Sequence, residues 1–205
     1  MLKELDKKEE KTPAGFSGKF MIVGKHSQKL HFFDQEIVYR EKRAPAKIQY
    51  MLIGYHHGGH EFIKTFQAMK KRFLVIDYDP EVIDILERLK VNYLYGDATD
   101  LELLQEAGIE NVKMLVTTMI DHEANMFVVN LLREVNPNAI SICHANNIQE
   151  ATELYENGAS YVMIPHHLGS EKMSAFIKRT GGDKSEFDKH REKHLTALRS
   201  HLSES

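Results

Sequence analysis

The sequence predicts an α/β fold: a Rossmann-like doubly wound, mostly parallel sheet of six strands with a C-terminal crossover helix. Two observations predict it. From Tyr50 onward, short runs of β-branched and other apolar residues alternate with amphipathic helical stretches, which is typical of βαβ units. The chain has 205 residues, 42% hydrophobic and 28% charged. This suits one domain, since domains cluster at about 100–150 residues, with further segments attached.

Six apolar runs are short enough to be buried parallel strands, and each gap between them holds one helical stretch, as right-handed crossovers require. The predicted strands are 49–53, 73–76, 91–94, 114–117, 140–143 and 161–164. The predicted helices between them are 59–71, 80–89, 101–107, 122–134 and 148–157.

Local signals agree with these helix boundaries. Asp79 precedes a proline and is the predicted N-cap of its helix, and Thr99 with Glu102 predicts a capping box. Gly108 and Gly158 stand where two of the helices are expected to stop.

The predicted Rossmann domain spans 49–165. Residues 1–48 hold two β-like runs, 20–23 and 36–39, which form either a hairpin or a linker and are left unassigned. Residues 166–205 are expected to be helical.

The C-terminal part predicts two helices. The first begins near Gly169 and breaks at Gly181, and the second spans 184–202 with apolar residues at helical spacing. On the first helix, Met173, Phe176 and Ile177 belong either to the core or to a seam between two copies, and spacing alone does not distinguish these.

Composition excludes several classes of protein. With 27 Lys and Arg against 30 Asp and Glu, the net charge of −3 predicts no nucleic-acid partner. No apolar run reaches the roughly 20 residues needed to cross a bilayer, and residues 1–11 do not resemble a secretory signal. The single cysteine, Cys143, lies in an apolar run and suits a core role in a reducing, cytoplasmic compartment.

The first strand ends in a glycine turn that takes the place of the G-x-G-x-x-G phosphate turn. Gly54 and Gly59 fill the first and third glycine positions, but His56 replaces the second, where the backbone approaches a diphosphate. Its ring either crowds a diphosphate or moves aside and donates a hydrogen bond to a phosphate. The candidate phosphate-binding residues are Gly54, Tyr55, His56, His57, Gly58 and Gly59.

Asp77 ends the second strand 18 residues after Gly59, close to the offset at which an acidic residue accepts hydrogen bonds from ribose hydroxyls. A carboxylate there disfavours a 2′-phosphate and therefore NADP. Tyr78, next to it, joins the candidate site, and Asp97 with Ala98 follows the third strand where an adenine or ribose would rest.

Thr117 and Thr118 end the fourth strand, beside the first strand across the predicted switch point, so their hydroxyls and amides are expected to face the same crevice. His144 follows the fifth strand. It is either a cation that meets a phosphate or a capped histidine on the surface.

Two histidine clusters, at 56–60 and 190–201, raise the question of a metal site. On a helix, His194 and His201 are about two turns apart, roughly 10 Å, so one ion cannot be held by the whole second cluster without another chain. We expect no bound metal.

The motifs, in their order, resemble the regulator of K⁺ conductance domain, also called KTN or TrkA-N. The resemblance covers about residues 49–180 and rests on the turn at 54–59, the stretches 75–81, 96–100 and 107–109, Asp121 with Asn125, and 157–165. The stretch from Tyr155 through His166-His167-Leu168-Gly169-Ser170-Glu171 resembles most the cytoplasmic domains of Kef-type monovalent cation:proton antiporters.

This resemblance implies a cytoplasmic regulatory domain that binds AMP, ADP, ATP or NAD(H) in the Rossmann crevice. It also implies a homodimer that pairs through a helix at about 168–178. Nucleotide occupancy would gate a membrane-embedded K⁺ or Na⁺ transport unit, in the same chain or a separate subunit. His56 departs from the family pattern and leaves NAD, a mononucleotide or an empty site open.

Two alternatives remain. A nicotinamide-dependent oxidoreductase uses the same half-sheet. However, about 40 residues follow the last predicted strand, too few for a substrate domain, and the sequence has no Tyr-x-x-x-Lys pair. We therefore expect no enzyme. The other alternative is a nucleotide-free dimerising scaffold.

Overall fold

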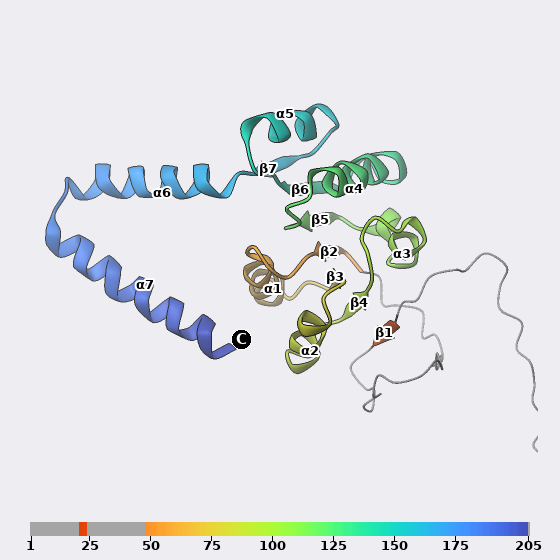
Figure 1. Ribbon diagram of the computed structural model, residues 1–205, viewed down its shortest axis with the longest axis horizontal. Helices are drawn as coiled ribbons and strands as arrows, with labels where there is room; N and C mark the ends of the chain where they lie inside the picture. The colour runs from red at the N-terminus through yellow and green to blue at the C-terminus, as the bar shows by residue number, and fades with distance from the viewer. Residues whose placement is uncertain (1–20, 24–47, 205) are drawn as a thin grey trace, which may run out of the picture.

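The sheet has seven strands, in the order β1-β4-β3-β2-β5-β6-β7 (Figure 1). The computed structural model describes residues 21–23 and 48–204. Six strands run parallel and confirm the predicted Rossmann-like sheet. They are β2 (Tyr50–Ile53), β3 (Phe73–Asp77), β4 (Tyr93–Tyr95), β5 (Met114–Thr117), β6 (Ile140–His144) and β7 (Tyr161–Met163).

The remaining strand, β1 (Met21–Val23), lies antiparallel to β4 at the edge of the sheet. Residues 21–23 of the N-terminal run predicted at 20–23 thus belong to the sheet, and residue 20 lies outside the described residues. The other run, 36–39, lies outside the described residues.

Five helices connect the parallel strands as predicted, to within a few residues at their ends. They are α1 (Gly59–Ala68), α2 (Pro80–Arg88), α3 (Leu101–Glu106), α4 (His122–Val135) and α5 (Ile148–Glu156). A short 3₁₀ helix, η1 (Ile109–Asn111), precedes β5 and was not predicted.

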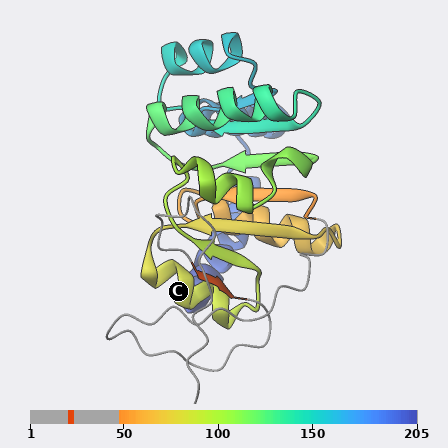
Figure 2. The same ribbon diagram turned by 90° about the vertical axis from the view of Figure 1, so that its right-hand side faces the viewer.

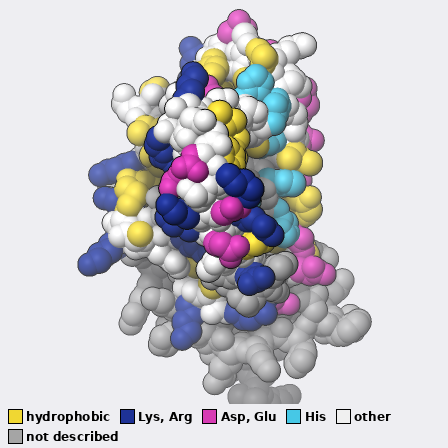
Figure 3. Space-filling view, turned by 90° about the vertical axis from the view of Figure 1, so that its left-hand side faces the viewer, with side chains coloured by type: hydrophobic (Ala, Val, Ile, Leu, Met, Phe, Trp, Pro, Cys, Tyr) yellow, Lys and Arg dark blue, Asp and Glu magenta, His cyan; other side chains and the backbone are white. Residues whose placement is uncertain are grey.

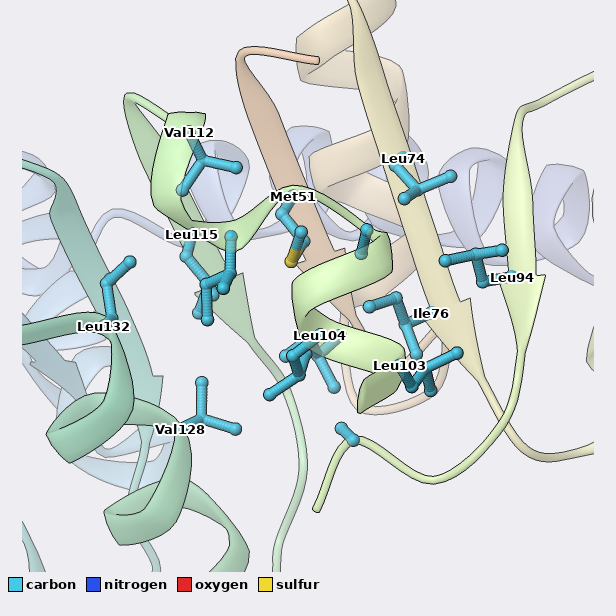
Figure 4. Close-up of a cluster of buried hydrophobic side chains, with 14 residues drawn as sticks. Met51, Leu74, Ile76, Leu94, Leu103, Leu104, Val112, Leu115, Val128 and Leu132 are labelled. Atoms are coloured by element: carbon cyan, nitrogen blue, oxygen red, sulfur yellow. The ribbon is translucent and has the colours of Figure 1, made fainter. Parts of the chain in front are cut away.

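Helices cover both faces of the sheet, and Figure 2 looks onto the face that carries α3 and α4. Because side chains alternate along a strand, β2 sends Met51 and Ile53 to one face and Leu52 to the other. The Met51 face packs against α3 and α4 in the cluster drawn in Figure 4, which contains Leu104 and Val128. Leu52 packs with side chains of α1 and α2.

A third cluster covers the β6–β7 end of the sheet and contains Cys143, Val129, Leu154 and Val162. Cys143 is fully buried, and burial raises the pKa of its thiol to about 12. The thiol is therefore protonated at neutral pH and serves as a small apolar core group.

The structure confirms one predicted cap and corrects another. The Asp79 side chain accepts a hydrogen bond from the backbone N–H of Glu81 at the start of α2. The predicted capping box was wrong. Asp100, not Thr99, caps α3, because the carboxylate of Asp100 accepts from the first-turn N–H groups, at 2.9 Å from Glu102.

Two helices follow the sheet, α6 (Pro165–Thr180) and α7 (Lys184–Glu204), and extend to one side of it (Figure 1). The break falls at Gly181, as predicted, where the chain is left-handed at φ +59. Phe176 is buried and packs edge-on against Phe187 of α7, with ring centroids 4.8 Å apart. Of the three α6 residues left open by the sequence, Phe176 is therefore intramolecular core.

The other two, Met173 and Ile177, are 43% and 48% exposed. Figure 3 views this side of the molecule and shows hydrophobic side chains at the surface among charged ones. Across the described ranges, no helix combines the length and apolar character needed to cross a membrane.

Candidate functional site

The predicted site residues follow the parallel strands, so the fold brings them to one edge of the sheet. β2 lies at the centre, paired with β3 on one side and β5 on the other. From these two strands the chain turns to opposite faces, to α1 after β2 and to α4 after β5. The carboxyl ends of β2 and β5 therefore flank a topological switch point, where open α/β sheets bind ligands.

The turn after β2 is tight and depends on two glycines. Gly54 has φ +87, a left-handed conformation that favours glycine. A Cβ on Gly59 would lie 2.3 Å from the carbonyl oxygen of Gly54, so a side chain at position 59 would force the helix away from the turn. These are the roles predicted for the first and third glycines.

The middle of the turn presents backbone N–H groups. His57 and Gly58 are both left-handed, with φ 54 and φ 99, directly before the N-terminus of α1. Within the described part of the chain, the N–H groups of His56, His57 and Gly58 form no backbone hydrogen bond. Successive N–H groups at a helix N-terminus make a concave site for an anion, and the helix dipole adds to it.

Asp77 lies beside this turn and is 8% exposed. One carboxylate oxygen accepts from the backbone N–H of Tyr55 at 2.8 Å, and the other from that of Asp79 at 3.0 Å. Asp77 therefore fixes the turn against the end of β3. Each carboxylate oxygen keeps a second lone pair, which can accept from a ligand hydroxyl.

The two threonines at the end of β5 differ in what they contact. The hydroxyl of Thr118 lies 2.8 Å from the carbonyl oxygen of His56 and 3.1 Å from that of Gly54, so it ties β5 to the turn. Thr117 is fully buried and donates to Asn125 at 2.6 Å. Its side chain thus holds the strand end in place and is engaged by the protein.

Asn125 is a residue to which the sequence argument gave no role of its own. Its amide group donates to the carbonyl oxygens of Met119 and His144, at 2.8 and 3.2 Å. It thereby joins the ends of β5 and β6 from its position on α4. The sequence does carry a signal for this role, because Asn125 is a polar residue near the start of the helix that follows the switch point, among the apolar positions of that helix.

The loop after β4 sits next to the end of β3, since the N–H of Gly96 donates to the carbonyl of Asp77. Within it, the Asp97 carboxylate accepts from the backbone N–H and hydroxyl of Thr99, at 2.8 and 2.9 Å. Ala98 is buried, whereas Tyr78, in the loop after β3, is 73% exposed. Asp97 and Tyr78 are thus exposed to solvent at the carboxyl edge of the sheet.

His56, the departure from the glycine pattern, faces Asp79. Its Nε2 atom lies 3.6 Å from a carboxylate oxygen of Asp79, and its side chain is 61% exposed. The two side chains approach each other from the loops after β2 and β3. Asp79 was predicted only as a helix cap, and its pairing with His56 was not predicted.

His144 is not a surface histidine: it is 6% exposed, at the carboxyl end of β6. Among the described residues, its Nδ1 atom is buried without a hydrogen-bond partner. Burial lowers the pKa of its ring, and the charge of His57 lowers it further, while Glu150 acts in the opposite direction.

The two histidine clusters were the candidate metal sites of the sequence. In the described ranges, no three His, Cys, Asp or Glu side chains are placed to hold one ion. His190 stacks on Phe176 with ring centroids 4.6 Å apart, which gives it a packing contact between α6 and α7. A separate open hollow of about 470 Å³ lies on α6 and is lined by His166, His167, Ser170, Glu171, Ser174, Ala175 and Lys178.

Comparison with known proteins agrees with this fold. Residues 50–165 match the TrkA-N domain. The probable potassium channel protein 2 of Methanocaldococcus jannaschii is 28% identical over 145 residues, which make up 69% of this chain and 42% of that protein. This chain therefore spans less than half the length of that relative.

Solved structures share the fold at lower identity. The TrkA-N domain of inner membrane protein ybaL from Escherichia coli superposes with a TM-score of 0.62 and 23% identity, over 65% of this chain and 99% of that one. The Kef C-terminal domain of Shewanella denitrificans in its AMP-bound form superposes with a TM-score of 0.57 and 18% identity, over 76% of this chain and 94% of that one. The GsuK channel bound to NAD superposes with a TM-score of 0.53 and 14% identity, over 60% of this chain and 22% of that one.

Proposed function

Since this chain belongs to the TrkA-N domain family, we propose that it is a regulatory domain that binds an adenine nucleotide and gates a transport unit for K⁺ or Na⁺. That unit is a cation:proton antiporter or a K⁺ transport system, and the domain would work at its cytoplasmic face. Similar structures described as AMP-bound and NAD-bound support an adenine nucleotide as the ligand.

The observation that carries this proposal is the position of Asp77 beside the glycine turn. Its carboxylate is nearly buried and is bonded to the N–H of Tyr55, within the turn itself. A ribose bound by Asp77 would therefore lie directly next to the N–H groups of His57 and Gly58, which would receive the phosphate. A 2′-phosphate would face the carboxylate, so NADP is disfavoured.

The remaining residues of the site would border the same ligand. Asp97, Ala98 and Tyr78 would lie on the adenine and ribose side, and Thr118 beneath the phosphate. Asn125 and Thr117 would support the crevice from below, because both are buried and bonded to each other. None of these groups needs to act on a substrate, so we propose binding without catalysis.

Gating requires that nucleotide binding changes the structure outside the crevice, and the arrangement of two paired copies is one property that binding can change. We propose that two copies pair through α6, with the exposed Met173 and Ile177 on the paired surface. Leu168, 38% exposed, would extend it. Phe176 would anchor α6 to α7 within each copy and transmit movement between them.

A ligand panel tests this function. Calorimetric titration of the chain with AMP, ADP, ATP, NAD, NADH and NADPH should give binding by adenine nucleotides and none by NADPH. A bound ligand should also raise the melting temperature, because it stabilises only the native state. If none of these ligands binds, the nucleotide-free dimerising scaffold becomes the better account.

A further inference from the structure

His144 stands out because it is a buried side chain at the carboxyl edge of the sheet and one of its ring nitrogens has no partner among the described residues. Nδ1 of His144 is buried with no hydrogen bond to the described residues. A buried polar atom without a partner destabilises the fold, so each such atom calls for an explanation.

The side chain lies on the face of the sheet that carries α1. Residues two apart on a strand point to the same face, and Ile142 of β6 packs with the cluster of α1 and α2 side chains. His144 therefore faces the same side as the N-terminus of α1 and the glycine turn. The adjacent Cys143 points to the opposite face, where it packs against α4 and α5.

Two charged groups act on the His144 ring. His57, in the glycine turn, opposes its protonation, and Glu150, on α5, favours it. The Glu150 carboxylate is itself occupied by the side chain and N–H of Asn146 and the side chain of Asn147. Among the described residues, burial and His57 therefore favour the neutral ring, and only Glu150 opposes them.

We propose that His144 is a proton-linked phosphate ligand: it takes up a proton from solvent when a nucleotide phosphate enters the crevice, and its N–H then donates to a phosphate oxygen. This rests on the nucleotide binding proposed above. A phosphate dianion bound between the turn and β6 would offset the positive charge of His57. It would also supply the hydrogen-bond acceptor that the His144 ring lacks. Nucleotide affinity would then fall as pH rises, which makes the domain responsive to cytoplasmic pH.

Calorimetry of AMP binding in buffers of different ionisation enthalpy tests this. At about pH 7.5 the AMP phosphate, with a second pKa of about 6, is already almost fully ionised and contributes little to the proton balance. The wild type should take up about one proton per AMP bound. His144→Gln should take up none and should bind AMP about tenfold more weakly.

Adenosine and a distant histidine supply the controls. Adenosine lacks the phosphate, so wild type and His144→Gln should bind it equally and without proton uptake. His194→Gln changes an exposed histidine on α7 and should leave AMP binding and proton uptake at the wild-type values. In the wild type, the NMR-titrated pKa of His144 should rise when AMP is added, a measurement that needs no variant to fold.

The outcomes separate the two proposals. Equal proton uptake by wild type and His144→Gln, or no uptake by the wild type while AMP and adenosine both bind, would overturn the role of His144 and leave nucleotide binding intact. Failure of the wild type to bind either AMP or adenosine would overturn the nucleotide site itself, and with it this inference.

Discussion

The carboxylate of Asp77 accepts a hydrogen bond from the backbone N–H of Tyr55 at 2.8 Å, across 22 positions of the sequence. This bond joins the end of β3 to the turn after β2. The predicted ribose ligand is therefore also a support of the predicted phosphate turn. Any change at Asp77 acts on both parts of the crevice, which shapes the first prediction.

Asp77→Ala should abolish binding of adenosine ligands, because it removes the acceptor for the ribose hydroxyls. It also leaves the N–H groups of Tyr55 and Asp79 without their partner, so the free energy of unfolding should fall by about 1–3 kcal/mol without loss of the fold. Calorimetry with AMP and urea unfolding measure the two effects. Asp84→Ala, an exposed carboxylate on α2, is the control and should retain AMP affinity. Unchanged AMP affinity in Asp77→Ala would remove the ribose assignment.

His56→Gly should strengthen NAD binding by about tenfold, or about 1.4 kcal/mol. His56 occupies the position at which the backbone of a dinucleotide turn approaches the diphosphate, and its Nε2 atom lies 3.6 Å from the Asp79 carboxylate. AMP, which lacks the diphosphate, should gain much less. A calorimetric comparison of both ligands checks this, and equal NAD affinity in the two proteins would show that the ring does not obstruct a diphosphate.

Gly59→Ala should lower the free energy of unfolding by about 1–3 kcal/mol, because its Cβ would lie 2.3 Å from the carbonyl oxygen of Gly54. Gly169→Ala is the matched control. It lies on helix α6 with no atom within 4 Å of an added Cβ, so it should be neutral or stabilising by up to about 1 kcal/mol. Urea unfolding of both variants decides the matter. Equal effects would mean that the turn is looser than the structure has it.

The ligand-free domain should lose stability as pH falls through about 6.5, the ordinary pKa of histidine. Burial lowers the pKa of His144 in the native state, so in this range the unfolded chain binds more protons than the folded one. The contribution of the neutral His144 to the free energy of unfolding is complete above pH 6.5. It is lost progressively as the pH falls toward the lower pKa that His144 has in the native state. His144→Gln should flatten this pH dependence in urea unfolding, and His194→Gln should not. Identical pH profiles for wild type and His144→Gln would contradict it.

Met173→Asp on α6 should convert a dimer into monomers, since it places a charge on an exposed apolar surface that we propose is paired. Analytical ultracentrifugation measures the change. Leu198→Asp, an equally exposed position on α7, should leave the dimer unaffected. A wild type that sediments as a monomer at all concentrations would exclude pairing through α6 in this chain.

Most of the fold followed from the sequence because its signals are local. Strands such as β5 have brief apolar runs, and Asp79 before a proline marks a helix start directly. The capping box failed because Thr99 and Asp100 are both good caps, and the choice depended on Asp97. The carboxylate of Asp97 engages Thr99 within the loop and leaves Asp100 to cap α3.

The site was predictable in its residue types but not in its contacts. Strand order alone brought Gly54, Asp77 and Thr118 to one edge. The burial of His144, the engagement of Thr117 by Asn125 and the approach of His56 to Asp79 depend on side-chain packing between segments far apart in sequence. No pattern of spacing carries that information.

The most direct test of the central claim is an NMR titration of the ¹⁵N-labelled chain with AMP. We predict that the largest amide shifts fall on Gly54–Gly59, Asp77 and the loop around Asp97, while amides in the middle of α7 stay unchanged. Shifts confined to the hollow on α6, at His167 and Lys178, or no shifts at saturating AMP, would contradict nucleotide binding in the crevice.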